Sequence, residues 1–190
     1  GCIDDPAPEL RRDAVALIIE DAIAESDEKS ACSLYEKALY AARDVDQIEA
    51  TAEALREKNR EVDLPKIMGF LMRWKVVGPF DNTDRKGFDV PYPPEGKIDF
   101  SANYEGKNGK VKWTNFSTPD QFGKVDINLE YGELKQVVAY AHNTFHLSEA
   151  RDLQFRLGCK NAWKVWLNGE LLFARDEYHR GQRIDQYVFS

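Results

Sequence analysis

The stretch Trp163-Lys-Val-Trp-Leu-Asn-Gly-Glu-Leu-Leu-Phe173 decides the fold, because it consists of two short apolar segments joined by an Asn-Gly dipeptide. A two-residue hairpin turn of the primed type needs positive φ at both central positions, which Asn and Gly tolerate. The sequence therefore predicts a β-hairpin that turns at Asn168 and Gly169. Counting outward from the turn gives the expected cross-strand pairs: Leu167 with Glu170, Trp166 with Leu171, Val165 with Leu172, and Lys164 with Phe173.

This register gives the expected hairpin two apolar faces. The first face is expected to be core and comprises Trp163, Val165, Leu167 and Leu172. The second face comprises Trp166, Leu171 and Phe173. It is too apolar to be left in water, so more protein or a ligand is expected to cover it.

Composition indicates a globular chain and limits its partners. The 190 residues are 43% hydrophobic and 12% aromatic, enough to build a core for one large domain or a small pair. The formal net charge of -7, with basic and acidic residues interspersed, disfavours nucleic acid and anionic lipid. No apolar run approaches the ~20 residues that cross a bilayer, so membrane insertion is not expected.

The three cysteines, Cys2, Cys32 and Cys159, are far apart and form no Cys-x-x-Cys pair. This spacing argues against a zinc knuckle and against a disulfide-dense scaffold. At most one bridge can form, and buried thiols are the favoured interpretation over a bridge.

Residues 8 to about 60 carry apolar side chains at three- and four-residue steps, which predicts helices. The acid-rich Glu25-Ser-Asp-Glu28 separates the first helix from the second, and Asp44 or Asp46 opens a third. Abundant alanine allows close helix approach, as in stacked helical repeats. We therefore expect residues 1–66 to be an antiparallel helical cap, at the end of a helical-repeat array.

Strand signals follow this helical segment. The expected strands cover 70–77, 111–116, 125–129, 135–142, 153–157, the two arms of the hairpin, and 184–189. Gly78-Pro79 is expected to end the first strand, and the turn-rich segment that runs to about residue 110 is expected to be an ordered loop. The fold class is thus α+β, with an antiparallel β-sandwich or jelly roll over residues 67–190. Because the last strand reaches Ser190, we expect the native polypeptide to continue and complete the sheet.

Several short motifs of this second segment are similar to those of a known family. They are Trp74-Lys-Val-Val-Gly-Pro-Phe80-Asp-Asn82, Tyr92-Pro-Pro-Glu95, Trp113, Tyr140-Ala141 and Val165-Trp-Leu-Asn-Gly169. Over roughly residues 70–190 the chain resembles galactose-binding-like jelly-roll modules of secreted or cell-envelope bacterial proteins, notably of planctomycete type, where HEAT-like helices often precede them. The closing Gly-x-Asn stretch and the final strand of that pattern are missing here. The resemblance implies a non-catalytic accessory role, in some members with a sugar ligand.

Trp166 is the sharpest candidate for a ligand platform, because an aromatic ring stacks on the apolar face of a pyranose. The alternative is that protein covers the ring, and the continuous apolar pattern of its face favours that alternative. Tyr178, His179 and Arg180 supply stacking and hydrogen-bonding groups on the loop before the last strand, the kind of loop where binding sites occur. An ordinary solvated loop is the favoured interpretation there.

Two further clusters contain side chains that commonly bind metals. Asp81, Asp84 and Asp89 crowd the long loop, and jelly rolls of this kind often hold a structural calcium, although the spacing matches no EF-hand loop. His142 and His146 are four residues apart, but the expected strand and the missing Glu of a His-Glu-x-x-His motif favour structural histidines.

Catalytic motifs are not apparent in the sequence, which holds no Gly-x-Ser-x-Gly elbow and no phosphate-binding glycine loop. No cofactor is expected, apart from the candidate calcium. The leading hypothesis is a non-catalytic binding module of a larger extracytoplasmic protein, whether periplasmic, cell-envelope or secreted, with a glycan as its ligand. The alternative is a protein-interaction scaffold or spacer that contacts a protein partner or other domains of the same polypeptide.

Overall fold

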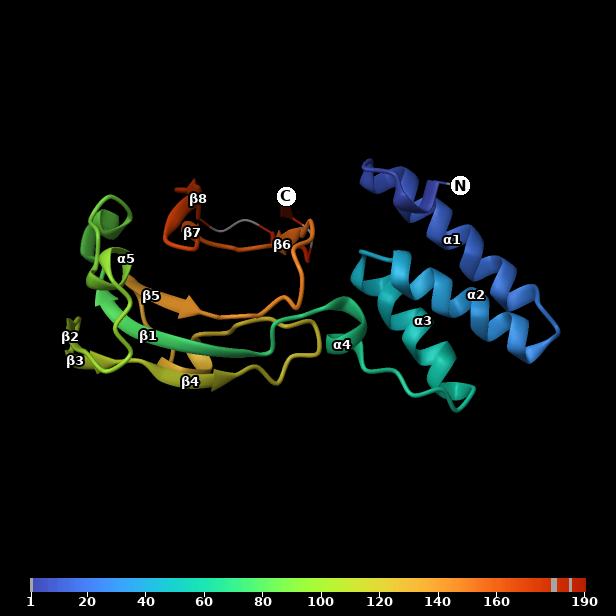
Figure 1. Ribbon diagram of the computed structural model, residues 1–190, viewed down its shortest axis with the longest axis horizontal. Coiled ribbons are helices and arrows are strands. Elements are labelled where there is room, and N and C mark those ends of the chain that lie inside the picture. Colours follow the sequence, from blue (N-terminus) through green and yellow to red (C-terminus); the bar gives the residue numbers. More distant parts are fainter. Residues whose placement is uncertain (1, 179–180, 185) are drawn as a thin grey trace. The chain divides into compact units, whose positions relative to one another are not determined.

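A computed structural model describes residues 2–178, 181–184 and 186–190 of the chain (Figure 1). The chain is of the α+β class, with helices at its start followed by small antiparallel sheets. It divides into two compact units. Unit 1 comprises Gly1–Phe70, Gln154–Gly158 and Arg183–Ser190, and unit 2 comprises Leu71–Leu153 and Cys159–Gln182.

Unit 1 contains the three helices that the apolar periodicity predicted, α1 (Pro8–Ala24), α2 (Glu28–Ala41) and α3 (Val45–Glu57). It also contains η1 (Cys2–Asp4) and α4 (Leu64–Met68), which were not predicted. The break between α1 and α2 falls at the expected acidic stretch, where the Asp27 carboxylate accepts a 2.8 Å hydrogen bond from the Ser30 amide and caps α2. Pro8 occupies the first turn of α1, where its missing N–H costs no helical hydrogen bond.

Small residues allow the three long helices of unit 1 to pack closely. Helix α2 contacts both α1 and α3, and Ala38, Ala42 and Ala52 are fully buried in these contacts. Leu39 and Ile48 are among the larger side chains fully buried in these helices. Unit 1 also holds a two-stranded antiparallel sheet of β6 (Phe155–Leu157) and β9 (Tyr187–Phe189), so its boundaries differ from a simple division after residue 66.

Unit 2 is built on a three-stranded antiparallel sheet with the order β4-β1-β5 (Figure 1). Its elements are β1 (Arg73–Asp81), η2 (Thr83–Phe88), α5 (Pro93–Gly96), β2 (Asn103–Gly106), β3 (Gly109–Lys112), β4 (Thr114–Ser117), α6 (Asn128–Tyr131), β5 (Val137–His142), β7 (Trp163–Leu167) and β8 (Glu170–Arg175). Strands β2 and β3 form one separate hairpin and β7 and β8 another. The expected turn-rich loop is thus ordered by η2, α5 and β2.

The centre of unit 2 is aromatic. Phe80 is 1% exposed, and Tyr92 and Tyr140 lie with their ring centroids 5.1 and 5.7 Å from the Phe80 ring. Val77 and Trp113 are buried in the same cluster. These contacts connect β1 to β5 and to the segment that leads into α5.

Three strand predictions for unit 2 were wrong. The single strand expected over 111–116 is divided between β3 and β4, which belong to different sheets. Strand β1 does not end at Gly78-Pro79 but continues to Asp81, because its pairing with β5 shifts register between Val77 and Phe80, and the proline lies in that irregularity, where the ladder needs no donor. The expected strand over 125–129 is absent: the Asp126 carboxylate accepts a 3.1 Å hydrogen bond from the Asn128 amide, which turns the chain into α6.

The hairpin at Asn168 and Gly169 is confirmed. Both residues have positive φ, 53° and 88°, and Leu167 pairs with Glu170 and Trp166 with Leu171 as expected. Beyond that point the predicted register was wrong, because a bulge between Val165 and Trp166 pairs Val165 with Phe173.

The bulge also changes the expected faces of the hairpin. Phe173 lies against Trp163, with ring centroids 5.1 Å apart, and so belongs to the face that was expected to be core. Leu167 and Leu172, expected in that core, are exposed.

The structure confirms helices followed by antiparallel strands, whereas the strands of the described residues are distributed over four small, separate sheets. In the described part of the chain, no helix is long and apolar enough to cross a membrane.

The hairpin turn gives a direct stability test. Gly169→Ala places a Cβ on a residue with φ of 88°, so we expect unit 2 to lose about 1 kcal/mol of unfolding free energy. Urea unfolding followed by tryptophan fluorescence measures this, since Trp74, Trp113, Trp163 and Trp166 all lie in unit 2. Gly96→Ala, at a position with open space and no positive φ, is the control and should unfold like the parent. Equal midpoints for the two variants would contradict the assigned turn.

Candidate functional site

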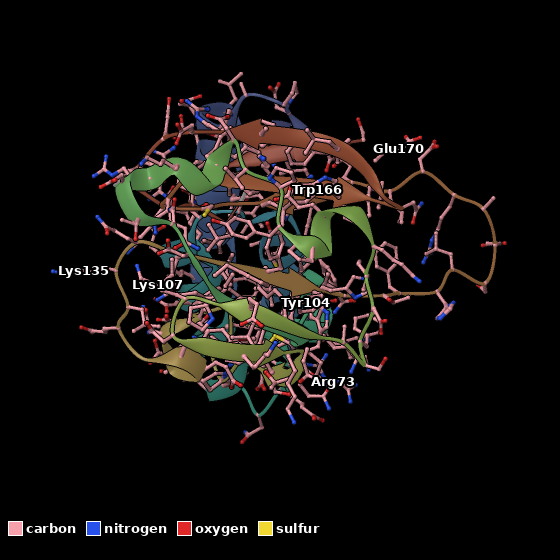
Figure 2. The ribbon with its side chains drawn as sticks, turned by 90° about the vertical axis from the view of Figure 1, so that its left-hand side faces the viewer. Arg73, Tyr104, Lys107, Lys135, Trp166 and Glu170 are labelled. Atoms are coloured by element: carbon pink, nitrogen blue, oxygen red, sulfur yellow. The ribbon has the colours of Figure 1, made fainter. Side chains whose placement is uncertain are left out.

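The candidate site lies where the β7–β8 hairpin meets α5 and β5. We call it the Glu95 cluster, and it comprises Phe88, Glu95, Tyr140, Lys164 and Trp166. Lys164 and Trp166 are two residues apart on β7 and therefore share a face of the hairpin. In Figure 2, Trp166 is drawn nearer the centre of the molecule, whereas Glu170, at the turn, is drawn at its margin.

Glu95 is the polar centre of this cluster. Its Oε1 accepts a hydrogen bond from the Tyr140 hydroxyl, and its Oε2 lies 3.8 Å from Lys164 Nζ. The side chains of Glu95 and Lys164 are only 13% and 19% exposed. A charge with so little solvent needs a partner, and each of these two supplies one for the other.

Aromatic rings complete the cluster on either side of the ion pair. Lys164 Nζ lies 4.9 Å from the centroid of the Phe88 ring, within the range of a cation–π contact. The Trp166 and Tyr140 ring centroids are 6.2 Å apart. Trp166 is half-buried, and its contact with Tyr140 supports the interpretation that protein covers part of the ring.

The pKa values of two tyrosines near Glu95 reflect the electrostatic environment of the cluster. Burial raises the pKa of Tyr140 well above its ordinary value, and the hydrogen bond to the Glu95 carboxylate raises it further. Burial likewise raises the pKa of Tyr92, with smaller contributions from the charges of Asp81 and Glu95. Both phenols are therefore neutral donors at physiological pH.

Chemically, the Glu95 cluster offers a ring face, a cation and an anion. An ammonium group has three donors and an ionised carboxylate about four acceptor positions, so Lys164 and Glu95 keep hydrogen-bonding capacity beyond their mutual contact. This combination suits the binding of a polar ligand with an apolar face.

The loop residues expected beside Trp166 are only partly described. Tyr178 lies against Arg85, whose guanidinium carbon is 4.7 Å from the centroid of the Tyr178 ring. Arg85 and its neighbour Asp84 both have left-handed φ, 61° and 58°, in the η2 segment. His179 and Arg180 lie outside the described residues, so their part in a site stays a prediction.

The three expected calcium ligands do not converge. The Asp81 carboxylate accepts a hydrogen bond from Thr83, which lowers its pKa, and it lies 3.3 Å from Lys107 Nζ. Asp84 pairs with Lys86 at 3.3 Å. Over residues 2–178, 181–184 and 186–190, no group of three or more acidic, His or Cys side chains could hold a metal ion. The calcium prediction, which also named Asp89, gains no support from this geometry.

Lys107 has a structural role beside these acids. Its Nζ donates to the carbonyl oxygens of Lys135 and Gln136 at 3.2 and 2.7 Å, and its amide donates to the Pro79 carbonyl at 2.8 Å (Figure 2). These bonds fasten the β2–β3 hairpin to the entry of β5.

The two histidines in the described residues have different environments. His142 is half-buried, with its ring centroid 5.1 Å from that of Phe100 and 6.2 Å from that of Trp113. Burial lowers its pKa, and the charge of Lys75 lowers it further. His146 is exposed in an irregular segment. A structural role for His142 is consistent with this packing.

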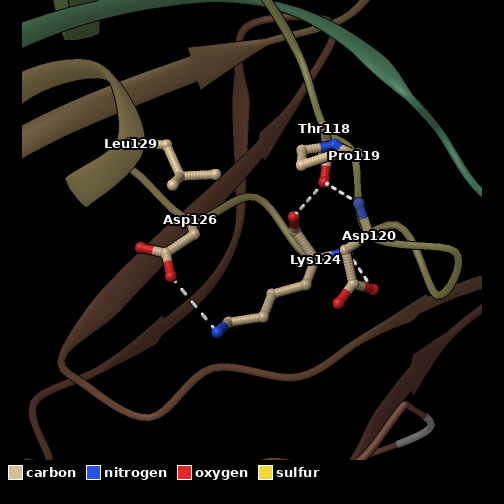
Figure 3. Close-up of a pocket in the computed structure, with 6 residues that line it drawn as sticks. All are labelled: Thr118, Pro119, Asp120, Lys124, Asp126 and Leu129. Atoms are coloured by element: carbon tan, nitrogen blue, oxygen red, sulfur yellow. Dashed lines mark hydrogen bonds and ion pairs between the residues drawn. The ribbon is translucent and has the colours of Figure 1, made fainter.

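A depression of about 200 Å³ lies between the end of β4 and α6 (Figure 3). Its lining residues are Thr118, Pro119, Asp120, Lys124, Asp126 and Leu129. The polar groups bond to one another: Thr118 Oγ1 donates to the Lys124 carbonyl, and Lys124 Nζ lies 3.3 Å from the Asp126 carboxylate. Burial raises the pKa of Asp126, but the hydrogen bonds from Lys124 and Asn128 and the charge of Lys124 together outweigh it and leave the pKa below its usual value. We therefore do not place the site here.

Sequence reasoning found Trp166 but assigned no role to its charged neighbours. Glu95 and Tyr140 occurred in the motifs that carried the family resemblance, and Lys164 was placed in the hairpin. The alternation of β7 could have indicated that Lys164 shares the face of Trp166. Nothing local could show that Glu95 lies opposite that face.

No protein-family model, curated protein or solved structure matched this chain.

Removing the Tyr140 hydroxyl should change the alkaline stability of unit 2. A pKa raised on folding means that the protonated phenol stabilises the folded state below about pH 10, and this contribution is lost as the pH rises through the raised value. Tyr140→Phe should cost about 1 kcal/mol at neutral pH, through the lost hydrogen bond, and should then lose less stability than the parent above about pH 10.

Urea midpoints followed by tryptophan fluorescence across this pH range test the expectation. Tyr104→Phe is the matched control. It also removes a hydroxyl from the aromatic centre, but this hydroxyl bonds to the Asp99 carbonyl and not to Glu95. Parallel pH curves for the parent and Tyr140→Phe would contradict the assigned role.

Proposed function

We propose that the chain is a non-catalytic binding module of a larger extracytoplasmic protein, with a carbohydrate ligand bound at the hairpin. The observation that carries the proposal is the position of the half-buried Trp166 ring beside the poorly exposed Lys164 and Glu95. Carbohydrate sites need an aromatic face for the C–H side of the sugar and nearby donors and acceptors for its hydroxyls. The Glu95 cluster supplies each of these groups.

Tyr178 extends the proposed site beyond the hairpin. It lies three residues after the end of β8, and its ring contacts Arg85. In this proposal, the adjacent His179 and Arg180 contribute further hydrogen bonds to the ligand. Loops positioned by a rigid sheet commonly carry such contacts.

The finer fold is part of the same proposal. We infer that unit 2 is a variant of the galactose-binding-like jelly roll, and the antiparallel pairing of β1 with β4 and β5 supports this. The extracytoplasmic location and the larger parent protein are inferred from the motif resemblance.

Replacing the ring should weaken sugar binding. We expect Trp166→Ala to lose retention on immobilised glycans by about two- to tenfold, since an aromatic stacking contact contributes roughly 0.5–1.5 kcal/mol. Glycan-array screening of the parent comes first, followed by affinity electrophoresis on any glycan that binds. Trp74→Phe, on β1 and outside the Glu95 cluster, is the control and should bind like the parent. Absence of retention by the parent, or equal retention by Trp166→Ala, would refute the proposal.

A second candidate function is protein docking, and the exposed apolar residues of the hairpin favour it. Leu171 is 55% exposed and Leu172 42% exposed, next to Leu167 at the turn. Apolar side chains that gather on one hairpin are typical of surfaces covered by another protein or domain.

If this surface is a docking site, it must be accessible to apolar probes. We expect Leu171→Ser to lower the fluorescence of the dye ANS bound to the protein, without a change in unfolding midpoint, because the variant removes an exposed apolar side chain. Leu129→Ser is the matched control at 63% exposure on α6 and should give a smaller decrease. Equal decreases in both variants would contradict a special role for the hairpin, and unchanged glycan retention in Leu171→Ser would separate this surface from the carbohydrate site.

A further inference from the structure

The β7–β8 hairpin is a separate two-stranded sheet within the described residues. An isolated two-stranded hairpin is marginally stable in water at best. Its position in unit 2 therefore depends on side chains, and the contacts of Lys164 and Trp166 reach α5, η2 and β5.

The Lys164–Glu95 ion pair differs from the other ion pairs of unit 2. The Lys110–Glu105 pair on the β2–β3 hairpin has side chains that are 67% and 76% exposed, against 19% and 13% for Lys164 and Glu95. Exposed pairs contribute little to stability, whereas loss of one partner from a shielded pair leaves a charge with little solvent. We therefore expect the contact between Glu95 and Lys164 to contribute to the position of the hairpin.

The chain on either side of the hairpin is irregular. Segments 159–162 and 176–178 lack helix and strand, and the hairpin lies between them. The segment Cys159–Gln182 belongs to unit 2, whereas the segments before and after it, Gln154–Gly158 and Arg183–Ser190, belong to unit 1. Irregular segments of this kind can absorb the backbone rotation that accompanies movement of a hairpin.

We propose that the β7–β8 hairpin is a flap that opens as one unit, and that the contacts of Lys164 with Glu95 and of Trp166 with Tyr140 latch it closed. Opening separates Trp166 from Tyr140 and exposes both rings, while the β4-β1-β5 sheet stays intact. The proposal concerns the protein without a ligand, so it does not depend on the identification of a carbohydrate.

Hydrogen exchange of the whole chain, measured by mass spectrometry without any sugar, tests the latch. Glu95→Gln keeps the shape of the side chain but removes its charge, and we expect amides of residues 163–175 to exchange about tenfold faster than in the parent. Amides of β1 and β5 should keep the parent's rates, which also shows that the variant folds. Glu105→Gln, in the exposed pair, is the matched control and should leave the hairpin unchanged.

A second variant tests the latch from the other side. Lys164→Met should accelerate exchange over residues 163–175 as Glu95→Gln does, and the double variant should exchange less rapidly than two independent effects would give, because both changes remove the same contact. The proposal is overturned if Glu95→Gln and Glu105→Gln give the same hairpin exchange, if β1 and β5 accelerate as much as the hairpin, or if the two effects multiply.

Discussion

A single carboxylate, that of Glu95, joins three segments of unit 2 that are far apart in the sequence. It accepts the hydroxyl of Tyr140 on β5 and pairs with Lys164 on β7, while its own backbone lies in the short helix α5. The Glu95 side chain is only 13% exposed, so water solvates its carboxylate poorly. Its desolvation has to be offset by these two partners, which ties the placement of the hairpin to that of α5.

The aromatic centre around Phe80 makes this arrangement possible. Tyr92 and Tyr140 both pack on Phe80, so apolar contacts alone bring the chain entering α5 close to the strand β5. Gly106 allows a further close approach, since a Cβ there would lie 2.8 Å from the Pro79 carbonyl oxygen. Burial of apolar rings thus fixes the backbone, and the polar contacts of Glu95 select one position for the hairpin.

Features determined by neighbouring residues could be predicted from the sequence, and features determined by distant ones could not. The Asn168-Gly169 turn and the break before α2 at Asp27 follow from local backbone preference and capping. The bulge at Val165 and Trp166 does not, because a hairpin can change register wherever its packing requires it. The same holds for Glu95, whose partner Tyr140 is 45 residues away and belongs to another element.

The bulge also shapes the surface that we propose as both ligand platform and latch. A regular register would place Phe173 opposite Lys164, on the face that also carries Trp166. The observed register moves Phe173 to the face of Trp163, so Lys164 and Trp166 share their face without that second ring. A ring next to a lysine that is paired with a shielded carboxylate serves both packing and polar recognition, and a ligand on that ring shares it with Tyr140. In the proposed flap, the contacts that hold the hairpin closed therefore control access to Trp166.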